Sequence, residues 1–144
     1  MSENYKSKPE MFHELSCYSS SHGDPEFIHQ YVVDAFALET ADDETKNIRV
    51  AFALIGLYLH VEKNFTGKEV QNAHIKLGKQ RKTWPRFVLP LNRGDIGIKN
   101  VMECPEGFKR DMAIENWCLS VWNAYSSCHE AVRELVQHEL WRDK

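Results

Sequence analysis

Histidine, cysteine and aspartate side chains gather near the start of the chain at spacings that could hold a metal ion. The 144 residues include seven histidines, and His13, His22 and His29 fall within seventeen positions of one another, with Cys17 among them. Zinc and similar ions bind imidazole nitrogen, thiolate sulfur and carboxylate oxygen, and a catalytic site keeps one coordination position for water. This segment supplies enough donors for a divalent metal ion, zinc first.

The ligand set has a geometric rationale. If residues 11–18 form a short helix, His13 and Cys17 are four residues apart and project from one face. His22 follows in the loop before the next helix, and residues on packed neighbouring helices could complete the shell. The predicted metal ligands are His13, Cys17, His22, His29, His60 and Asp34, the last as a ligand or as a partner that orients one. If the protein is an enzyme, metal-activated water or thiolate makes hydrolysis or group transfer the expected class.

The same residues also have a purely structural interpretation, because their spacing matches no standard zinc-finger pattern. In that interpretation His22 and Asp24 form a turn and a helix cap. Cys17 is then a core thiol, and His13 and His29 are hydrogen-bonded or face solvent. The sequence leaves both interpretations open.

His60 lies within an apolar helical stretch. There a neutral imidazole must satisfy both ring nitrogens or lose about 1 to 3 kcal/mol. We expect a satisfied core histidine, paired with Asp34. If His29 converges on these two, they could form an acid–base pair or support a metal ion.

A basic stretch offers a different function. All six charged residues between positions 70 and 94 are basic, whereas those between positions 24 and 45 are acidic. The alternative to metal binding is a non-enzymatic module whose 76–93 face engages a protein or a phosphate-containing partner, with Trp84 stacking on a base. A second copy of the chain, giving a homodimer, is another such partner, and an apolar surface could serve in place of the basic face. The basic stretch could equally face solvent and pair with the acidic segment.

Composition and motifs exclude several classes. A net charge of -3 gives no global attraction to nucleic acid or to an anionic membrane. The polar start has no signal-peptide pattern, and the apolar run 50–61 falls short of the roughly 20 residues that cross a bilayer, so we expect a cytoplasmic protein. The four cysteines form no CxxC pair and are expected to be free thiols, with Cys17 as the one candidate exception. No motif indicates a nucleotide or an organic cofactor.

Helical periodicity dominates the chain and predicts an all-α fold, a bundle of about four main helices in one domain over residues 1–144. We expect helices over 25–38, from an acidic N-cap at 42–44 to about 64, and over 67–82. Residues 108–140 are expected to form one long helix, or two with a break near 126–127. Residues 84–107 are expected to form an irregular connection, with a short strand or a helical turn near 99–102. Gly56, inside a helix, predicts the close approach of another group.

Several stretches of the sequence form a recognisable pattern: 13–15, 17–18, 22–25, 27–30, 33–35 and 56–62, with Trp84-Pro85, Arg93-Gly94 and Trp117 further along. In these stretches the chain resembles an uncharacterised bacterial family that is known as a domain of unknown function. The resemblance covers most of the chain and implies a bacterial source and a stand-alone domain. It implies no activity, substrate or catalytic residue.

Overall fold

A computed structural model describes residues 6–20 and 28–141, and these ranges contain seven α-helices, one 3₁₀ turn and no strand. The all-α prediction is confirmed, but there are more helices than the four main ones expected. The elements are α1 (Lys8–Ser20), α2 (Ile28–Thr40), α3 (Asn47–Lys63), α4 (Gly67–Gln80), α5 (Ile98–Glu103), α6 (Phe108–Ala124), η1 (Ser126–Cys128) and α7 (His129–Leu140).

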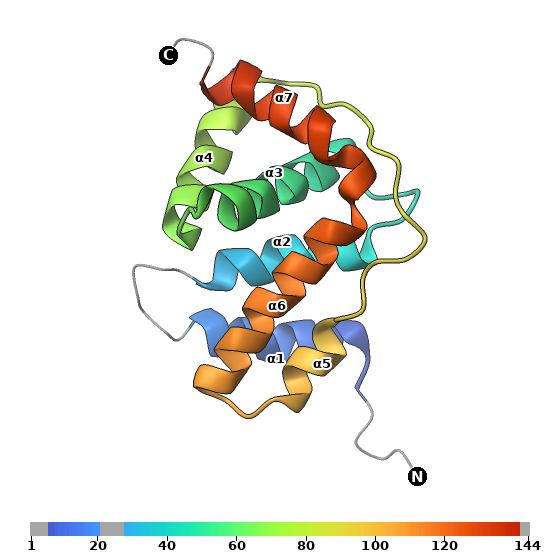
Figure 1. Ribbon diagram of the computed structural model, residues 1–144, viewed down its shortest axis with the longest axis vertical. Coiled ribbons are helices and arrows are strands. Elements are labelled where there is room, and N and C mark those ends of the chain that lie inside the picture. Colours follow the sequence, from blue (N-terminus) through green and yellow to red (C-terminus); the bar gives the residue numbers. More distant parts are fainter. Residues whose placement is uncertain (1–5, 21–27, 142–144) are drawn as a thin grey trace.

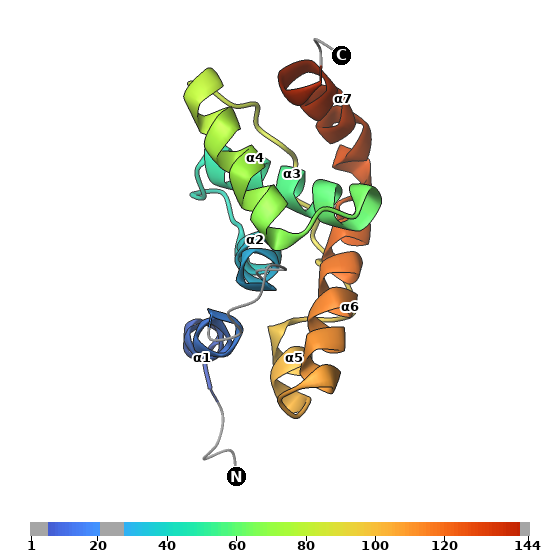
Figure 2. The same cartoon turned by 90° about the vertical axis from the view of Figure 1, so that its left-hand side faces the viewer.

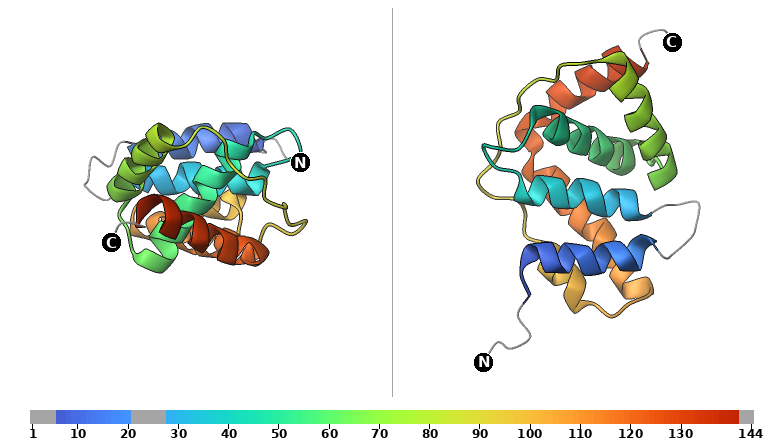
Figure 3. Two further views of the ribbon diagram at one scale, coloured as in Figure 1. Left: turned by 90° about the horizontal axis from the view of Figure 1, so that it is seen from above. Right: turned by 180° about the vertical axis from the view of Figure 1, so that it is seen from behind.

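Helices α1, α2 and α3 lie one above another, and α6 crosses in front of them (Figure 1). Seen from behind, the same three helices run side by side (Figure 3). After a quarter turn, α1 and α4 lie on one side of the molecule and α6 and α7 on the other, with α2 and α3 between them (Figure 2). Helix α2 packs against α1, α3, α4 and α6, so its faces meet different neighbours.

The core is one cluster of buried apolar side chains centred on α2, α3 and α6. Its largest fully buried members include Trp117, Trp122 and Tyr125 at the C-terminal half of α6 and just beyond it. Helix α3 is buried on nearly all sides, as its apolar sequence predicts. None of the helices within the described ranges is long and apolar enough to cross a membrane.

Some of the predicted helix boundaries are correct and one is wrong. Thr66 and Glu69 form the expected reciprocal capping box at the start of α4. The acidic N-cap expected at 42–44 is wrong, because α3 begins after Lys46 without a side-chain cap. Asp42 instead accepts hydrogen bonds from the Glu44 amide and the Thr45 hydroxyl and stabilises its own turn. The break near 126–127 is confirmed by the 3₁₀ turn between α6 and α7.

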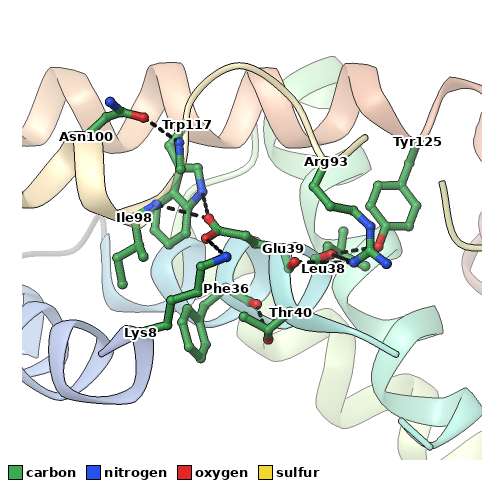
Figure 4. Close-up of polar contacts among 11 residues, drawn as sticks. Lys8, Phe36, Leu38, Glu39, Thr40, Arg93, Ile98, Asn100, Trp117 and Tyr125 are labelled. Atoms are coloured by element: carbon green, nitrogen blue, oxygen red, sulfur yellow. Dashed lines mark hydrogen bonds and ion pairs between the residues drawn. The ribbon is translucent and has the colours of Figure 1, made fainter. Parts of the chain in front are cut away.

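The connection between α4 and α6 is ordered and irregular, as predicted, and the helical turn expected near 99–102 is α5. We call residues 81–97 the strap. Arg93 holds it against α2 by donating hydrogen bonds to the carbonyls of Leu38 and Glu39 at 2.8 and 3.3 Å (Figure 4). Within the strap, Arg93 also donates to the Pro90 carbonyl at 2.6 Å.

Glu39, next to the C-terminal end of α2, connects three further elements. Its largely buried carboxylate accepts hydrogen bonds from Trp117 Nε1 at 2.9 Å and from the Ile98 amide at 3.0 Å, and it pairs with Lys8 Nζ at 2.9 Å (Figure 4). Because a buried carboxylate is costly unless its charge is hydrogen-bonded and paired, these donors account for its position. Glu39 thereby ties α1, α5 and α6 to α2.

Candidate metal site

The hollow between α1 and α2 brings together three of the predicted metal ligands. It measures about 480 Å³ and is lined by Phe12, His13, Ser16, Cys17, Ser20 and His29. We call it the α1–α2 hollow. Its α1 residues recur at the spacing that puts side chains on one helical face, so the local helix alone places His13 beside Cys17.

His13 and Cys17 have no structural task within the described residues. Both are exposed, and neither side chain makes a hydrogen bond or an ion pair with another described residue. All four cysteines are free thiols, as predicted. An exposed imidazole next to an exposed thiol can rotate toward a ligand without breaking a packed arrangement.

His29 reaches the same hollow from the first turn of α2. Its Nδ1 lies 3.1 Å from the Ser19 hydroxyl, and this hydroxyl lies 3.4 Å from the Ser16 carbonyl. If Ser19 donates to the carbonyl, it accepts from Nδ1, which puts the lone pair of the ring on Nε2. Burial lowers the pKa of His29, which favours the neutral imidazole that binds metals.

His22 and Asp24 lie outside the described residues, so their predicted roles as metal ligand, turn and helix cap are not tested. Within residues 6–20 and 28–141, no three histidine, cysteine or carboxylate side chains are grouped closely enough to hold a metal ion. The α1–α2 hollow therefore holds candidate ligands but no assembled coordination shell.

His60 lies elsewhere, on α3. Its Nδ1 is 3.2 Å from the Phe65 carbonyl, its Nε2 is 2.8 Å from a Glu115 carboxylate oxygen, and its ring stacks on Tyr31. Each ring nitrogen therefore lies within hydrogen-bond distance of an acceptor. The expected pairing of His60 with Asp34 is therefore wrong, because His60 is satisfied by residues of α6 and of the α3–α4 turn.

Asp34 is buried on the opposite side of α2 from the hollow, against α3 and α4. Gln30 donates a hydrogen bond to its Oδ1 at 3.2 Å, while its Oδ2 has no hydrogen-bond partner among the described residues. Burial raises the pKa of Asp34 well above its ordinary value, which favours the neutral carboxyl. Asp34 and His29 do not converge with His60, and the acid–base arrangement predicted for these three is absent from the described structure.

Gly56 explains how the Asp34 carboxyl fits. A Cβ atom at Gly56 would lie 1.9 Å from Asp34 Oδ2 and 3.2 Å from His74 Nε2. The close approach predicted at this glycine is confirmed, and the approaching group is the Asp34 carboxyl. His74, a residue that the sequence interpretation overlooked, donates through Nε2 to the Phe52 carbonyl at 2.9 Å, and burial lowers its pKa to about 4.

Fewer side chains of the basic face are available to bind a partner than the sequence predicts. Lys76, Lys79, Lys82 and Arg86 are exposed. Arg81, however, pairs with Glu139 at 2.8 Å, and Arg93 is engaged with α2 carbonyls. Trp84 is 7% exposed and packs edge-on against Phe52, so its predicted availability for base stacking is wrong.

Sequence interpretation also missed the serines of the hollow. Ser16 and Ser20 follow His13 and Cys17 by three residues, and this helical spacing was the available signal.

Comparison with curated proteins and with solved structures finds no match to this chain. A family model does match residues 9–126, a span that contains the α1–α2 hollow, the buried Asp34 and His60. The chain belongs to this family, which is described as a family of unknown function (DUF5946).

Proposed function

We propose that this protein binds a divalent transition-metal ion, zinc first, in the α1–α2 hollow through His13, Cys17 and His29. The observation that carries the proposal is the meeting of these three side chains around one hollow, from two different helices. Imidazole and thiolate are the donors that zinc prefers. His22, predicted as a further ligand, stays a prediction.

The ligand set is smaller than the one predicted from sequence. His60 and Asp34 are excluded from it, because the first is bound at both ring nitrogens and the second faces α3 and α4. The proposal requires His13 and Cys17 to rotate toward His29, which their exposure permits. Three protein ligands would leave a coordination position for water, as in catalytic zinc sites.

Metal content measured by mass spectrometry tests the proposal. Untagged protein, purified without chelator and without a nickel column, should carry near one equivalent of zinc or another transition metal per chain. His13→Ala and Cys17→Ala should each lower this content strongly. His138→Ala and Cys104→Ala are the matched controls, since these two residues lie on α7 and next to α5, away from the hollow.

An opposite result would redirect the search. If the wild-type protein is metal-free and takes up no added zinc, the metal proposal is wrong. The alternative, a binding module that uses the exposed Lys76, Lys79, Lys82 and Arg86, would then be tested by salt-dependent binding to a phosphate-containing polymer.

A further inference from the structure

The outer face of α6 carries a stripe of exposed apolar side chains. Phe108, Met112 and Leu119 are 78%, 45% and 46% exposed, and their spacing places them on one side of the helix. The opposite side contributes Ile114, Trp117 and Val121 to the core. In Figures 1 and 2 no other described element covers the outer side of α6. Three large apolar side chains in line on one helix differ from the scattered exposed residues of an ordinary surface.

A second hollow lies at the C-terminal end of this stripe. It measures about 580 Å³ and lies between α6 and the strap, lined by residues that include Pro90, Asp95, Asn116, Leu119, Ser120 and Asn123. We call it the α6 hollow. Phe108 lies at the other end of the same face, so the face has a projecting ring at one end and a depression at the other.

The wall of the α6 hollow is held in place. Gly94, with φ of +105°, lies so close to α6 that a Cβ atom would be 2.4 Å from the Ser120 hydroxyl and 2.8 Å from the Ser120 carbonyl oxygen. The Ile96 amide donates to this hydroxyl at 3.2 Å. Together with the Arg93 hydrogen bonds to α2, these contacts make the hollow a preformed feature.

Charges of opposite sign mark the two ends of the face. Lys109 is exposed beside Phe108, and Asp95 is exposed at the rim of the α6 hollow. Neither forms an ion pair with another residue of the described ranges. About eleven helical residues separate the two ends, a distance of roughly 16 Å at 1.5 Å per residue.

We propose that the outer face of α6 is the interface of a homodimer in which two copies of α6 pack antiparallel. A two-fold axis across the middle of the stripe brings the Phe108 ring of each copy to the α6 hollow of the other, and Lys109 of each copy to Asp95 of the other. Such a self-complementary pairing closes on itself. A parallel pairing would instead set Phe108 against Phe108 and Lys109 against Lys109, leaving both hollows empty.

Sedimentation velocity over a range of protein concentrations tests the interface. Wild-type protein should sediment as a dimer, and Phe108→Glu should raise the dimer dissociation constant at least about tenfold. Because Phe108 is largely exposed, this variant should fold, which circular dichroism checks. Ile75→Glu, a matched change at an exposed apolar residue of α4, should leave the dimer unchanged.

Charge reversal tests the orientation of the two copies. Lys109→Glu and Asp95→Lys should each raise the dissociation constant by about threefold to tenfold, and the double variant should restore it, because the pairing is then reversed on both sides. A monomeric wild-type protein, or a dimer that Phe108→Glu does not weaken, would overturn the proposal. A double variant as weak as the sum of its single variants would overturn the antiparallel arrangement.

Discussion

The histidines of this protein divide into two groups that resemble each other in sequence and differ in surroundings. His60, His74 and His129 each place a ring nitrogen about 3 Å from a backbone carbonyl and stack on an aromatic ring. In the α1–α2 hollow, by contrast, His13 and Cys17 are exposed and uncommitted within the described structure. The first group stabilises the packing of helices, and only the second can reorganise around a ligand. A high histidine count therefore indicates chemistry only where the rings line a hollow together with other metal-binding side chains.

Removing His60 should show the largest effect. His60→Ala should lower the free energy of unfolding by about 2 to 3 kcal/mol, because it deletes the stacking on Tyr31 and both hydrogen bonds of a ring whose side chain is 10% exposed. His138→Ala, at a side chain that is 61% exposed, should stay within about 0.5 kcal/mol. Urea unfolding measures both. Equal effects would contradict the structural role of His60.

Filling the space beside Asp34 should have the next-largest effect on stability. Gly56→Ala should destabilise the protein by about 1 to 3 kcal/mol, since the added methyl group overlaps a buried carboxyl that has little room to move. Gly78→Ala is the matched control on α4, where the nearest atom to the new Cβ lies 3.9 Å away. This control should stabilise by roughly 0.5 to 1 kcal/mol through helix propensity. A harmless Gly56→Ala would contradict the close packing of Asp34.

The buried carboxyl should also make stability depend on pH. The pKa of Asp34 is raised by burial, so its stabilising contribution is full below the ordinary value of 3.8 and is lost as pH rises through the folded-state pKa. Asp34→Asn does not titrate. The stability of Asp34→Asn relative to wild type should therefore increase as pH rises above 3.8 toward the raised folded-state pKa of Asp34. His74, whose pKa of about 4 makes acid destabilising below pH 6.5, is present in both proteins. A difference that stays flat with pH would show that Asp34 is not held neutral.

The smallest effects on stability should come from the hollow itself. His13→Ala and Cys17→Ala, measured in the presence of a chelator, should each change the free energy of unfolding by less than about 0.5 kcal/mol, because the deleted groups are exposed. Zinc should raise the unfolding temperature of the wild-type protein through mass action. The two variants should show little or no such increase when thermal unfolding is measured with and without zinc. Loss of more than 2 kcal/mol without metal would place these residues with the structural histidines.

Local sequence signals predicted the features that depend on neighbouring residues. Thr66 with Glu69 marks the start of α4, and the spacing of His13 and Cys17 puts both on one face. Gly56 correctly indicated a close approach inside a helix. The identity of the approaching group, Asp34 on α2, could not be predicted in the same way. It depends on which face of α2 packs against α3, and the local sequence does not determine this. Likewise His60 meets Glu115 across fifty-five positions, and Trp84 is buried because it lies in a strap whose path is determined by tertiary contacts.

Cobalt(II) titration tests the central claim, that the α1–α2 hollow binds a metal ion, most directly. Cobalt(II) occupies zinc sites, and a thiolate ligand adds a charge-transfer absorption band that reports on Cys17. We predict that wild-type protein shows this band, saturating near one cobalt per chain, that Cys17→Ser loses it while Cys104→Ser keeps it, and that His13→Ala weakens binding at least about tenfold. A wild-type protein without the band, or a Cys17→Ser variant with the same spectrum as wild type, would contradict the claim.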